Sequence, residues 1–285
     1  MAEGHNRKKP GSGFHAFLER RWKKLQRDWK RAGREYSSDS IHDLRVSARR
    51  FLSVIDVCRY VDDSLKTRRA RRWLKAILDH SGILRDLQVE RLYIVGLRQK
   101  FPELKEFDTA IAVKELRQAG KLKRFFKSVR KTPSSVSKLN DRVQKLVSQQ
   151  PRPQLRASVM RAVSHHHGRV MQRVQAIDPK VLESIHRVRV ALKQFRYAVE
   201  IAQPLLKVRL GARVLNQIRR SQAVMGRIHD LEVLSKDLAK WMGDKPRRQE
   251  ISPILLHLNR QIQVAVEEFM TTVESMETFW KSARS

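Results

Sequence analysis

The segment SIHDLRVSARR, from Ser40 to Arg50, has a near copy later in the chain, SIHRVRVALKQFR, from Ser184 to Arg196. In both segments apolar residues recur every three or four positions, which is the spacing of an amphipathic helix. Each segment also stacks basic residues one helical turn apart, as Arg45 and Arg49 do. Like charges at this spacing destabilise a helix by about 0.2–0.5 kcal/mol. An unfavourable pattern that occurs twice indicates that an anion from outside the chain meets it.

The two segments belong to a longer internal repeat with a constant shift of 144 positions, the separation of His42 from His186. The alignment needs no gap. Its identical pairs begin with the serines at 40 and 184 and extend to the valines at 89 and 233. The matched pairs include Arg45 with Arg189, Phe51 with Phe195, Gly82 with Gly226, Asp86 with Asp230, and Leu87 with Leu231. The repeat therefore predicts two halves of the same architecture, related by a pseudo-twofold axis.

Helical periodicity extends over most of the chain, and no alternation lasts long enough to indicate a sheet. The predicted helices cover residues 14–33, 37–61, 65–98, 103–131, a short middle helix between KTPSS and SQQPRPQ, 155–176, 180–206, 208–242 and 248–282. Serine and aspartate at 37–40 are candidate N-caps. We predict an all-α fold in which two pseudo-symmetric four-helix halves form one helical bundle.

The Pro- and Ser-containing stretches around the middle helix are the natural boundary between the halves. We expect a disordered basic tail at 1–13, a first half at 14–131, a connecting segment at 132–153 and a second half at 154–285.

Composition points to a polyanionic partner. The 285 residues include 61 Lys and Arg against 29 Asp and Glu, a formal net charge of +32. A field of this strength favours nucleic acid, an anionic membrane or an inorganic phosphate polymer, and it does not distinguish among them.

The single cysteine, Cys58, rules out an intramolecular disulfide and fits a reducing compartment. It lies in an apolar helical stretch, so we interpret it as a small core residue. The sequence has no apolar region typical of a signal peptide and no run of about 20 apolar residues. We therefore expect a cytoplasmic protein without a membrane span.

A helical wheel at about 100° per residue separates the basic residues of both copies from the apolar ones. His42, Arg45 and Arg49 fall together and form what we call the first ridge. The equivalent residues of the second copy, together with Arg196, form the second ridge: His186, Arg189, Lys193 and Arg196. The core is expected on the opposite faces, at Leu44, Ala48, Phe51 and Ile55 and at Val188, Leu192, Phe195 and Val199.

A solvated helix face usually mixes charges of both signs. On the ridges only Arg196 has an obvious acidic neighbour, Glu200 one turn later. Further cations accompany the ridges in the following helices, at Lys75, Arg219 and Arg220. Arginine binds phosphate through two parallel hydrogen bonds and lysine acts as a mobile point charge. Such residues on adjacent helices would form a groove for a repeated phosphate.

Taken together, the motifs HDLRVSARRFL and HRVRVALKQFR, followed by LRDLQV and IHDLEV, resemble the CHAD family, the conserved histidine α-helical domain. The resemblance spans nearly the whole chain, with both copies in order. It implies two four-helix halves and binding of inorganic polyphosphate in a central basic groove. The implied ligands are His42, Arg45, Arg49 and Arg50 in the first half and His186, Arg189, Lys193 and Arg196 in the second.

The chain departs from the family pattern at three places. Leu52 and Gln194 each replace a basic residue of the motif, and His229 stands where an arginine is expected. The two halves are therefore expected to contribute unequally. We interpret Asp86 and Asp230 as structural residues that orient a histidine or arginine of their own half.

Other candidate sites carry less weight. The consecutive histidines of SHHHGR, at 164–169, point about 100° apart on a helix and cannot all reach one metal ion. No nucleophile, base and orienting group are spaced for covalent catalysis, and no phosphate-binding glycine loop is present. We therefore expect no catalytic residue, no cofactor and no metal.

Three functions remain to be weighed. The favoured one is a non-enzymatic polyphosphate-binding module. Such a module could be located at polyphosphate granules in the cytoplasm. The alternative is a nucleic-acid-binding basic helical protein, although aromatic residues are only 7% of the chain and sit mostly at core-type positions. An enzyme acting on phosphate chains would need carboxylates to hold a metal ion, and the basic helices offer few. The resemblance decides in favour of polyphosphate, because charge alone does not separate it from nucleic acid.

Overall fold

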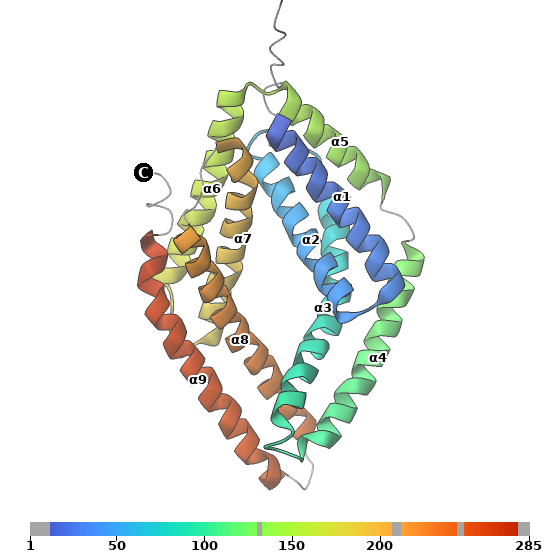
Figure 1. Cartoon of the computed structure of the whole chain (residues 1–285), viewed down its shortest axis with the longest axis vertical. Coiled ribbons are helices and arrows are strands. Elements are labelled where there is room, and N and C mark those ends of the chain that lie inside the picture. The colour runs from blue at the N-terminus through green and yellow to red at the C-terminus, as the bar shows by residue number, and fades with distance from the viewer. Residues whose placement is uncertain (1–11, 130–132, 207–211, 244–247, 279–285) are drawn as a thin grey trace, which may run out of the picture.

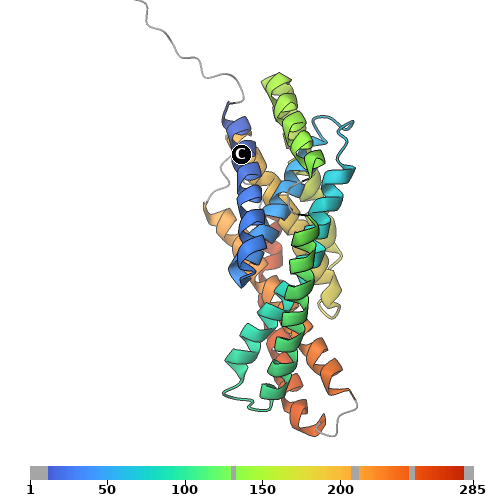
Figure 2. The same ribbon diagram turned by 90° about the vertical axis from the view of Figure 1, so that its right-hand side faces the viewer.

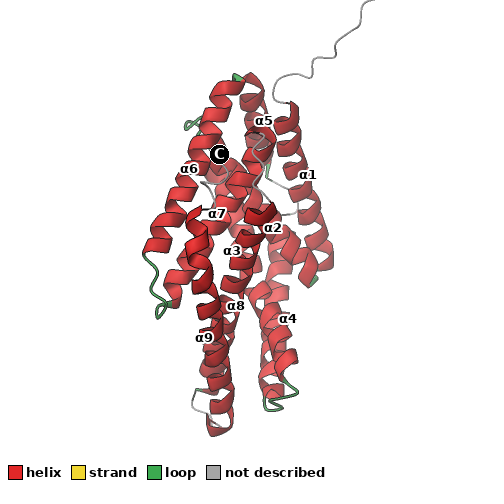
Figure 3. Cartoon of the chain, turned by 60° about the vertical axis from the view of Figure 1, so that its left-hand side comes forward, coloured by secondary structure: helices red, strands yellow, loops and turns green. Residues whose placement is uncertain are grey.

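A computed structural model describes residues 12–129, 133–206, 212–243 and 248–278. Within these ranges the chain forms helices joined by short loops and no strand, as Figure 3 shows. The helices are α1 (Ser12–Glu35), α2 (Ser38–Cys58), α3 (Arg68–Leu97), α4 (Leu104–Ser128), α5 (Ser134–Gln149), α6 (Arg152–Gln175), α7 (Leu182–Leu206), α8 (Ala212–Met242) and α9 (Arg248–Thr278). The predicted all-α helical fold is confirmed, with each helix close to its predicted range.

The helices form a diamond in which α2, α3, α7 and α8 lie on the inside (Figure 1). Helices α1, α4, α6 and α9 flank them, and a quarter turn shows the same arrangement from its narrow side (Figure 2). Within each half, consecutive helices pack in series, α1 to α4 and α6 to α9. Across the halves α2 packs on α7 and α3 on α8, while α1 meets α7 and α2 meets α6. These contacts occur in equivalent pairs, which is the pattern of a pseudo-twofold.

The predicted core positions of both ridge helices are buried. All eight apolar residues expected opposite the ridges are at most 3% exposed. Trp22, Trp29 and Trp73 also lie in the core, and the rings of Trp29 and Trp73 are 5.3 Å apart. Packing of these stripes supplies the hydrophobic stabilisation that holds the ridges in place.

The start of α2 is fixed by its N-cap. The Ser37 hydroxyl accepts a hydrogen bond from the backbone N–H of Ser40 at 3.2 Å, as the sequence predicts. Burial raises the pKa of the Cys58 thiol to about 12, so this residue is an inert part of the core. Of the predicted tail, Ser12 and Gly13 belong to α1, while residues 1–11 lie outside the described ranges.

The connecting segment contains the predicted middle helix, α5, which packs against α1 and α3 of the first half. Among the described residues α5 has no equivalent in the other half, so it makes the two halves unequal there. No helix in the described part of the chain is long and apolar enough to cross a membrane.

Candidate basic site between α2 and α7

Arg45, expected on the open face of the first ridge, is buried instead and only 8% exposed. Helix α3 covers it: Nη1 of Arg45 donates to the carbonyl oxygen of Leu78 at 2.6 Å and to the Ser81 hydroxyl at 3.2 Å. Burial and the nearby charge of Arg49 lower the pKa of Arg45 to about 10. Arg45 therefore stays charged at neutral pH while its hydrogen-bond partners are neutral groups.

The glycine of each half provides space for this arginine. A Cβ atom on Gly82 would lie 3.2 Å from Nη1 of Arg45, and one on Gly226 would lie 3.5 Å from Nη2 of Arg189. The repeat thus preserves a helix-to-helix contact in which a guanidinium lies against a glycine. The matched glycines in the sequence were the signal for this contact, which the helical wheel alone could not show.

The second ridge is held less tightly. Met225 stands in the position equivalent to Ser81, so Arg189 lacks that hydroxyl acceptor. Its Nε is buried without a hydrogen-bond partner in the described part of the chain. Burial lowers the pKa of Arg189, and the carboxylate of Asp230 opposes the shift. Arg189 is the less satisfied member of the pair.

Lys193 is the most strongly perturbed residue of the ridges. Burial is the main cause that lowers its pKa to about 7, followed by the charges of Arg189 and Arg49. Arg49 lies on α2 and Lys193 on α7, and these two helices pack on each other. Asp230 opposes the shift, but its negative charge does not compensate the burial and the neighbouring cations in full.

Three of the ridge cations have no partner among the described residues. Arg49, Arg189 and Lys193 make no side-chain hydrogen bond and no ion pair within 4.0 Å there. Mutually repelling, partly desolvated cations are costly unless an anion joins them. This cluster, Arg49 with Arg189 and Lys193, is the central cationic cluster.

The two ridge histidines lie at its edge. His42 is an exposed residue, and partial desolvation of its ring, followed by the charge of Arg85, lowers its pKa. The rings of His186 and His229 are 5.0 Å apart, so the residue that replaces the family's arginine contacts the second ridge. Burial and the charge of Arg189 lower the pKa of His229. As neutral rings, His42 and His229 can donate one hydrogen bond each.

Asp86 and Asp230 act on the ridges through charge. Burial raises the pKa of Asp230, and the positive charge of Arg189 opposes that shift. Asp86 in turn influences Arg45 of its own half and Arg189 and Asp230 of the other. Neither carboxylate hydrogen-bonds a ridge arginine in the described chain, so their expected orienting role reduces to electrostatic balance across α3 and α8.

Arg50 and Arg196 belong to a different cluster, centred on Glu200. The Glu200 carboxylate lies 3.3 Å from Nε of Arg50 and 3.8 Å from Nε of Arg196. It also accepts a hydrogen bond from Nη2 of Arg21 at 3.2 Å. Tyr197 lies under both guanidinium groups, 5.9 Å from that of Arg50 and 5.1 Å from that of Arg196.

Sequence reasoning found only part of this arginine cluster. The pair of Arg196 with Glu200 was visible because the residues are one turn apart. Arg21 is 179 positions from Glu200, and nothing in the local pattern of α1 indicates the contact. The cluster joins α1, α2 and α7, and its arginines already have an internal anion.

The structure does not bring the remaining predicted cations to the central cationic cluster. Lys75 lines a separate hollow beside α5. Arg219 donates to the side-chain oxygen of Asn216 at 3.3 Å within α8, and Arg220 is exposed. Their contacts among the described residues include no ridge residue.

The three consecutive histidines diverge on α6, as helix geometry predicts. His166 is buried, and burial lowers its pKa to about 4, while His165 is exposed and its ring lies 5.9 Å from that of Tyr60. Across the described residues no three His, Cys, Asp or Glu side chains are grouped to hold a metal ion.

Comparison with known proteins identifies the architecture. The family model described as the CHAD domain matches residues 16–239. The crystal structure of the CHAD domain from the plant Ricinus communis superposes with a TM-score of 0.69 at 17% identity, covering 93% of this chain and 91% of that one. PptA from Streptomyces chartreusis superposes with a TM-score of 0.61 at 14% identity, covering 95% and 100%. No curated protein matches the sequence.

Proposed function

The chain belongs to the CHAD family, and from that premise we propose that it binds inorganic polyphosphate without catalysing a reaction on it. The central cationic cluster is the observation that carries the proposal. Arg49, Arg189 and Lys193 come from two helices of different halves and share no internal anion among the described residues. A flexible chain of phosphates can lie between the helices and meet cations from both.

The chemistry of the cluster suits binding. Guanidinium groups donate forked hydrogen bonds to phosphate oxygens, and the lysine adds a point charge. Bound phosphate would remove the mutual repulsion of the cations, so the free energy of that repulsion would contribute to affinity. The residues of the cluster supply charge and hydrogen bonds, which hold a phosphate chain but do not activate a nucleophile.

Nucleic acid is the second candidate, because a net charge of +32 attracts any polyanion. Against it stands the burial of three of the tryptophans. Trp22, Trp29 and Trp73 are at most 7% exposed and cannot stack on bases. A cytoplasmic location, with polyphosphate granules among its sites, follows from the proposed ligand and stays part of the proposal.

The proposal is tested by titrating the protein with long-chain polyphosphate at about 0.15 M salt. Duplex DNA and single-stranded RNA compete at equal phosphate concentration. We expect tight binding that neither nucleic acid displaces, with an affinity that falls steeply as salt rises. If duplex DNA and single-stranded RNA displaced the bound polyphosphate as well as polyphosphate itself does, the result would contradict the proposal and favour a generic polyanion binder.

Removing the negative charge of Glu200 should strengthen polyphosphate binding. Replacing it with glutamine keeps its shape but removes the anion shared by Arg21, Arg50 and Arg196. We expect Glu200→Gln to lower the free energy of unfolding in urea by about 1–2 kcal/mol. The released arginines should tighten polyphosphate binding by roughly threefold to tenfold.

The matched control is Glu35→Gln, which removes the same charge from the exposed pair of Glu35 with Arg31 on α1. It should leave affinity within about twofold of the wild type, because an exposed pair contributes little. Weaker binding by Glu200→Gln would show that the Glu200 cluster is needed in its paired form.

A further inference from the structure

A second concentration of positive charge lies at the edge of the first half, away from the central cationic cluster. A hollow of about 1270 Å³ opens between the loop that follows α2, the first turns of α3, and α5. Nine of its lining residues are Lys or Arg, and Asp63 is the one acidic residue among them. We call this hollow the α3–α5 basin. It is lined from α3 by Arg68, Arg69, Arg72 and Lys75, and from α5 by Lys138 and Arg142.

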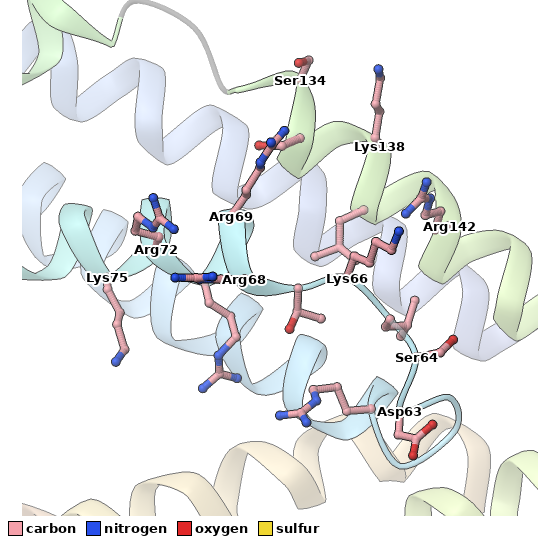
Figure 4. Close-up of a pocket in the computed structure, with 16 residues that line it drawn as sticks. Asp63, Ser64, Lys66, Arg68, Arg69, Arg72, Lys75, Ser134, Lys138 and Arg142 are labelled. Carbon is pink, nitrogen blue, oxygen red and sulfur yellow. The ribbon is translucent and has the colours of Figure 1, made fainter.

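Figure 4 shows these side chains on two sides of the loop that carries Ser64 and Lys66 into α3. Of the nine cations, only Arg71 has an acidic partner in the described chain, Asp56. The other eight make no ion pair there. The basin therefore has a large positive charge that the described protein does not balance.

The position of the arginines is unfavourable for folding. Arg68, Arg69, Arg71 and Arg72 occupy the first turns of α3, where the helix dipole already places positive charge. The Thr67 N-cap makes no side-chain hydrogen bond that would offset this. Basic residues at a helix start lower stability, so their concentration here calls for an anion to offset the repulsion.

The repeat shows that the fold does not require three of these cations. The shift of 144 aligns Arg68 with Ala212, Arg71 with Leu215 and Arg72 with Asn216. The equivalent helix α8 begins at Ala212, the position equivalent to the start of α3, and carries fewer cations there: only Arg213, equivalent to Arg69, and Arg219, equivalent to Lys75, are kept. The described part of the second half has no counterpart of α5, the helix that adds Lys138 and Arg142 one turn apart.

A series of polar and basic residues leads from the basin toward α7, the helix that carries the second ridge. Arg59, directly after α2, lines the basin and lies nine residues, roughly 13 Å, beyond Arg50 along the helix direction. Arg59 and Arg71 also line a smaller hollow of about 360 Å³, which reaches Gln194 on α7. Gln194 is the neighbour of Lys193 in sequence and accepts a hydrogen bond from Arg169 at 3.3 Å.

From this arrangement we propose that the α3–α5 basin binds a second stretch of the same phosphate polymer that the ridges hold. The inference rests on the proposed function and extends its site in one direction only, toward the first half. A polymer held at both places would gain affinity from the effective concentration of its second segment. The basin would then give the site a preference for long chains.

The test is a basin variant that carries Arg69→Gln, Arg72→Gln and Lys138→Gln. All three side chains are exposed and make no hydrogen bond or ion pair in the described chain, so the fold should be kept. We expect affinity for long-chain polyphosphate to fall roughly fivefold to tenfold at about 0.15 M salt. The slope of log affinity against log salt should become shallower by about 2, since single strands give about 0.7 per neutralised phosphate.

The matched control removes three exposed cations outside the basin, with Lys30→Gln, Lys123→Gln and Arg156→Gln. It should change affinity by less than about twofold. An equal loss of affinity in both triple variants would overturn the proposal of a basin site and show that only the overall positive charge attracts the polymer. A basin variant that binds like the wild type would overturn it too.

A variant of the central cationic cluster separates the two proposals. If the basin is wrong but the proposed function is right, the wild type and the basin variant bind equally while Arg49→Glu with Lys193→Glu loses binding. If the proposed function is wrong, the wild type itself shows no preference for polyphosphate over nucleic acid. The circular dichroism spectrum of every variant should match that of the wild type. If the basin variant unfolds on purification, Arg72→Gln alone is tested in its place.

Discussion

Replacing Arg49 and Lys193 together with glutamate should weaken binding of long-chain polyphosphate at least about 100-fold at physiological salt. The two positions are equivalent by the repeat, one on α2 and one on α7, and both belong to the central cationic cluster. Each substitution replaces an attraction with a repulsion at the place where the proposed ligand meets both halves. Like charges placed opposite each other across an interface cost several kcal/mol.

The structure decides which residues to change. Arg45 looks equally suitable in sequence, yet its guanidinium is buried against the Leu78 carbonyl and Gly82. A glutamate there would repel the carbonyl oxygen and disturb the contact of α2 with α3, so lost binding would not distinguish a site from a misfolded protein. Arg49 and Lys193 make no side-chain hydrogen bond or ion pair in the described chain, so their replacement tests the site itself.

The control for this prediction is Lys30→Glu with Arg156→Glu, which changes the net charge by the same amount. Both residues are exposed, one on α1 and the other on α6, and neither has an ion pair among the described residues. We expect less than about a threefold loss of affinity from this pair. Fluorescence anisotropy with labelled polyphosphate measures both variants. Equal losses would show that total charge, and not the central cationic cluster, governs binding.

Much of the fold could be read from the sequence because hydrophobic periodicity reports which side of each helix is buried. Leu44 and Phe51 of α2 and Val188 and Phe195 of α7 lie in the core as the wheel predicts. The N-cap at Ser37 was equally visible, since serine before an apolar repeat is a local signal. Local patterns sufficed wherever local interactions decide the structure.

Contacts between distant helices are where sequence reasoning failed. The wheel places Arg45 with Arg49 on one ridge, but it cannot tell that α3 covers the first and leaves the second partly open. The bond from Arg21 to Glu200 likewise depends on the packing of α1 against α7. These contacts divide the predicted cations into buried, internally paired and unpaired residues, and only the last group is available to a ligand without rearrangement.

The asymmetry of the halves was visible in part. Gln194 in place of a basic residue and His229 in place of arginine indicated unequal contributions. The larger difference comes from α5, whose packing on α1 and α3 turns the basic start of α3 into one wall of a basin. A helix can be predicted from its own residues, but the surface against which it packs cannot.

Lys193 gives the prediction with the second largest effect: polyphosphate binding should take up a proton above pH 7. In the free protein, burial and the charges of Arg189, Arg49 and Arg196 hold the pKa of Lys193 at about 7, with Asp230 opposing them. A bound phosphate favours the charged ammonium and raises that pKa. Between pH 7 and 9 the free lysine is therefore mostly neutral, and it must gain a proton when the anion binds.

The linkage has a definite sign. Binding is strongest where Lys193 is already charged, below pH 7, and it weakens as the pH rises toward the pKa of the bound form. We expect the affinity to fall roughly tenfold or more from pH 7 to pH 9, since one pKa unit corresponds to a factor of ten. The pKa values of His42 and His229 are lowered, so in the free protein both rings are neutral throughout this window, and the Lys193→Arg control separates any proton that they take up from that of Lys193.

Calorimetry in buffers of different ionisation enthalpy measures the proton uptake directly, and Lys193→Arg is the control that assigns it. Arginine keeps its charge throughout this range, so the variant should bind without proton uptake and with less than about a twofold change in affinity from pH 7 to 9. The control is needed because burial also raises the pKa of Glu90 to about 7, and this carboxyl titrates in the same region. If Lys193→Arg kept the pH dependence of the wild type, the proton would belong to another group and Lys193 would not contact the ligand. If Lys193→Arg still bound tightly but its affinity no longer depended on pH, the result would place the ammonium of Lys193 in contact with the phosphate chain, between the two halves of the protein.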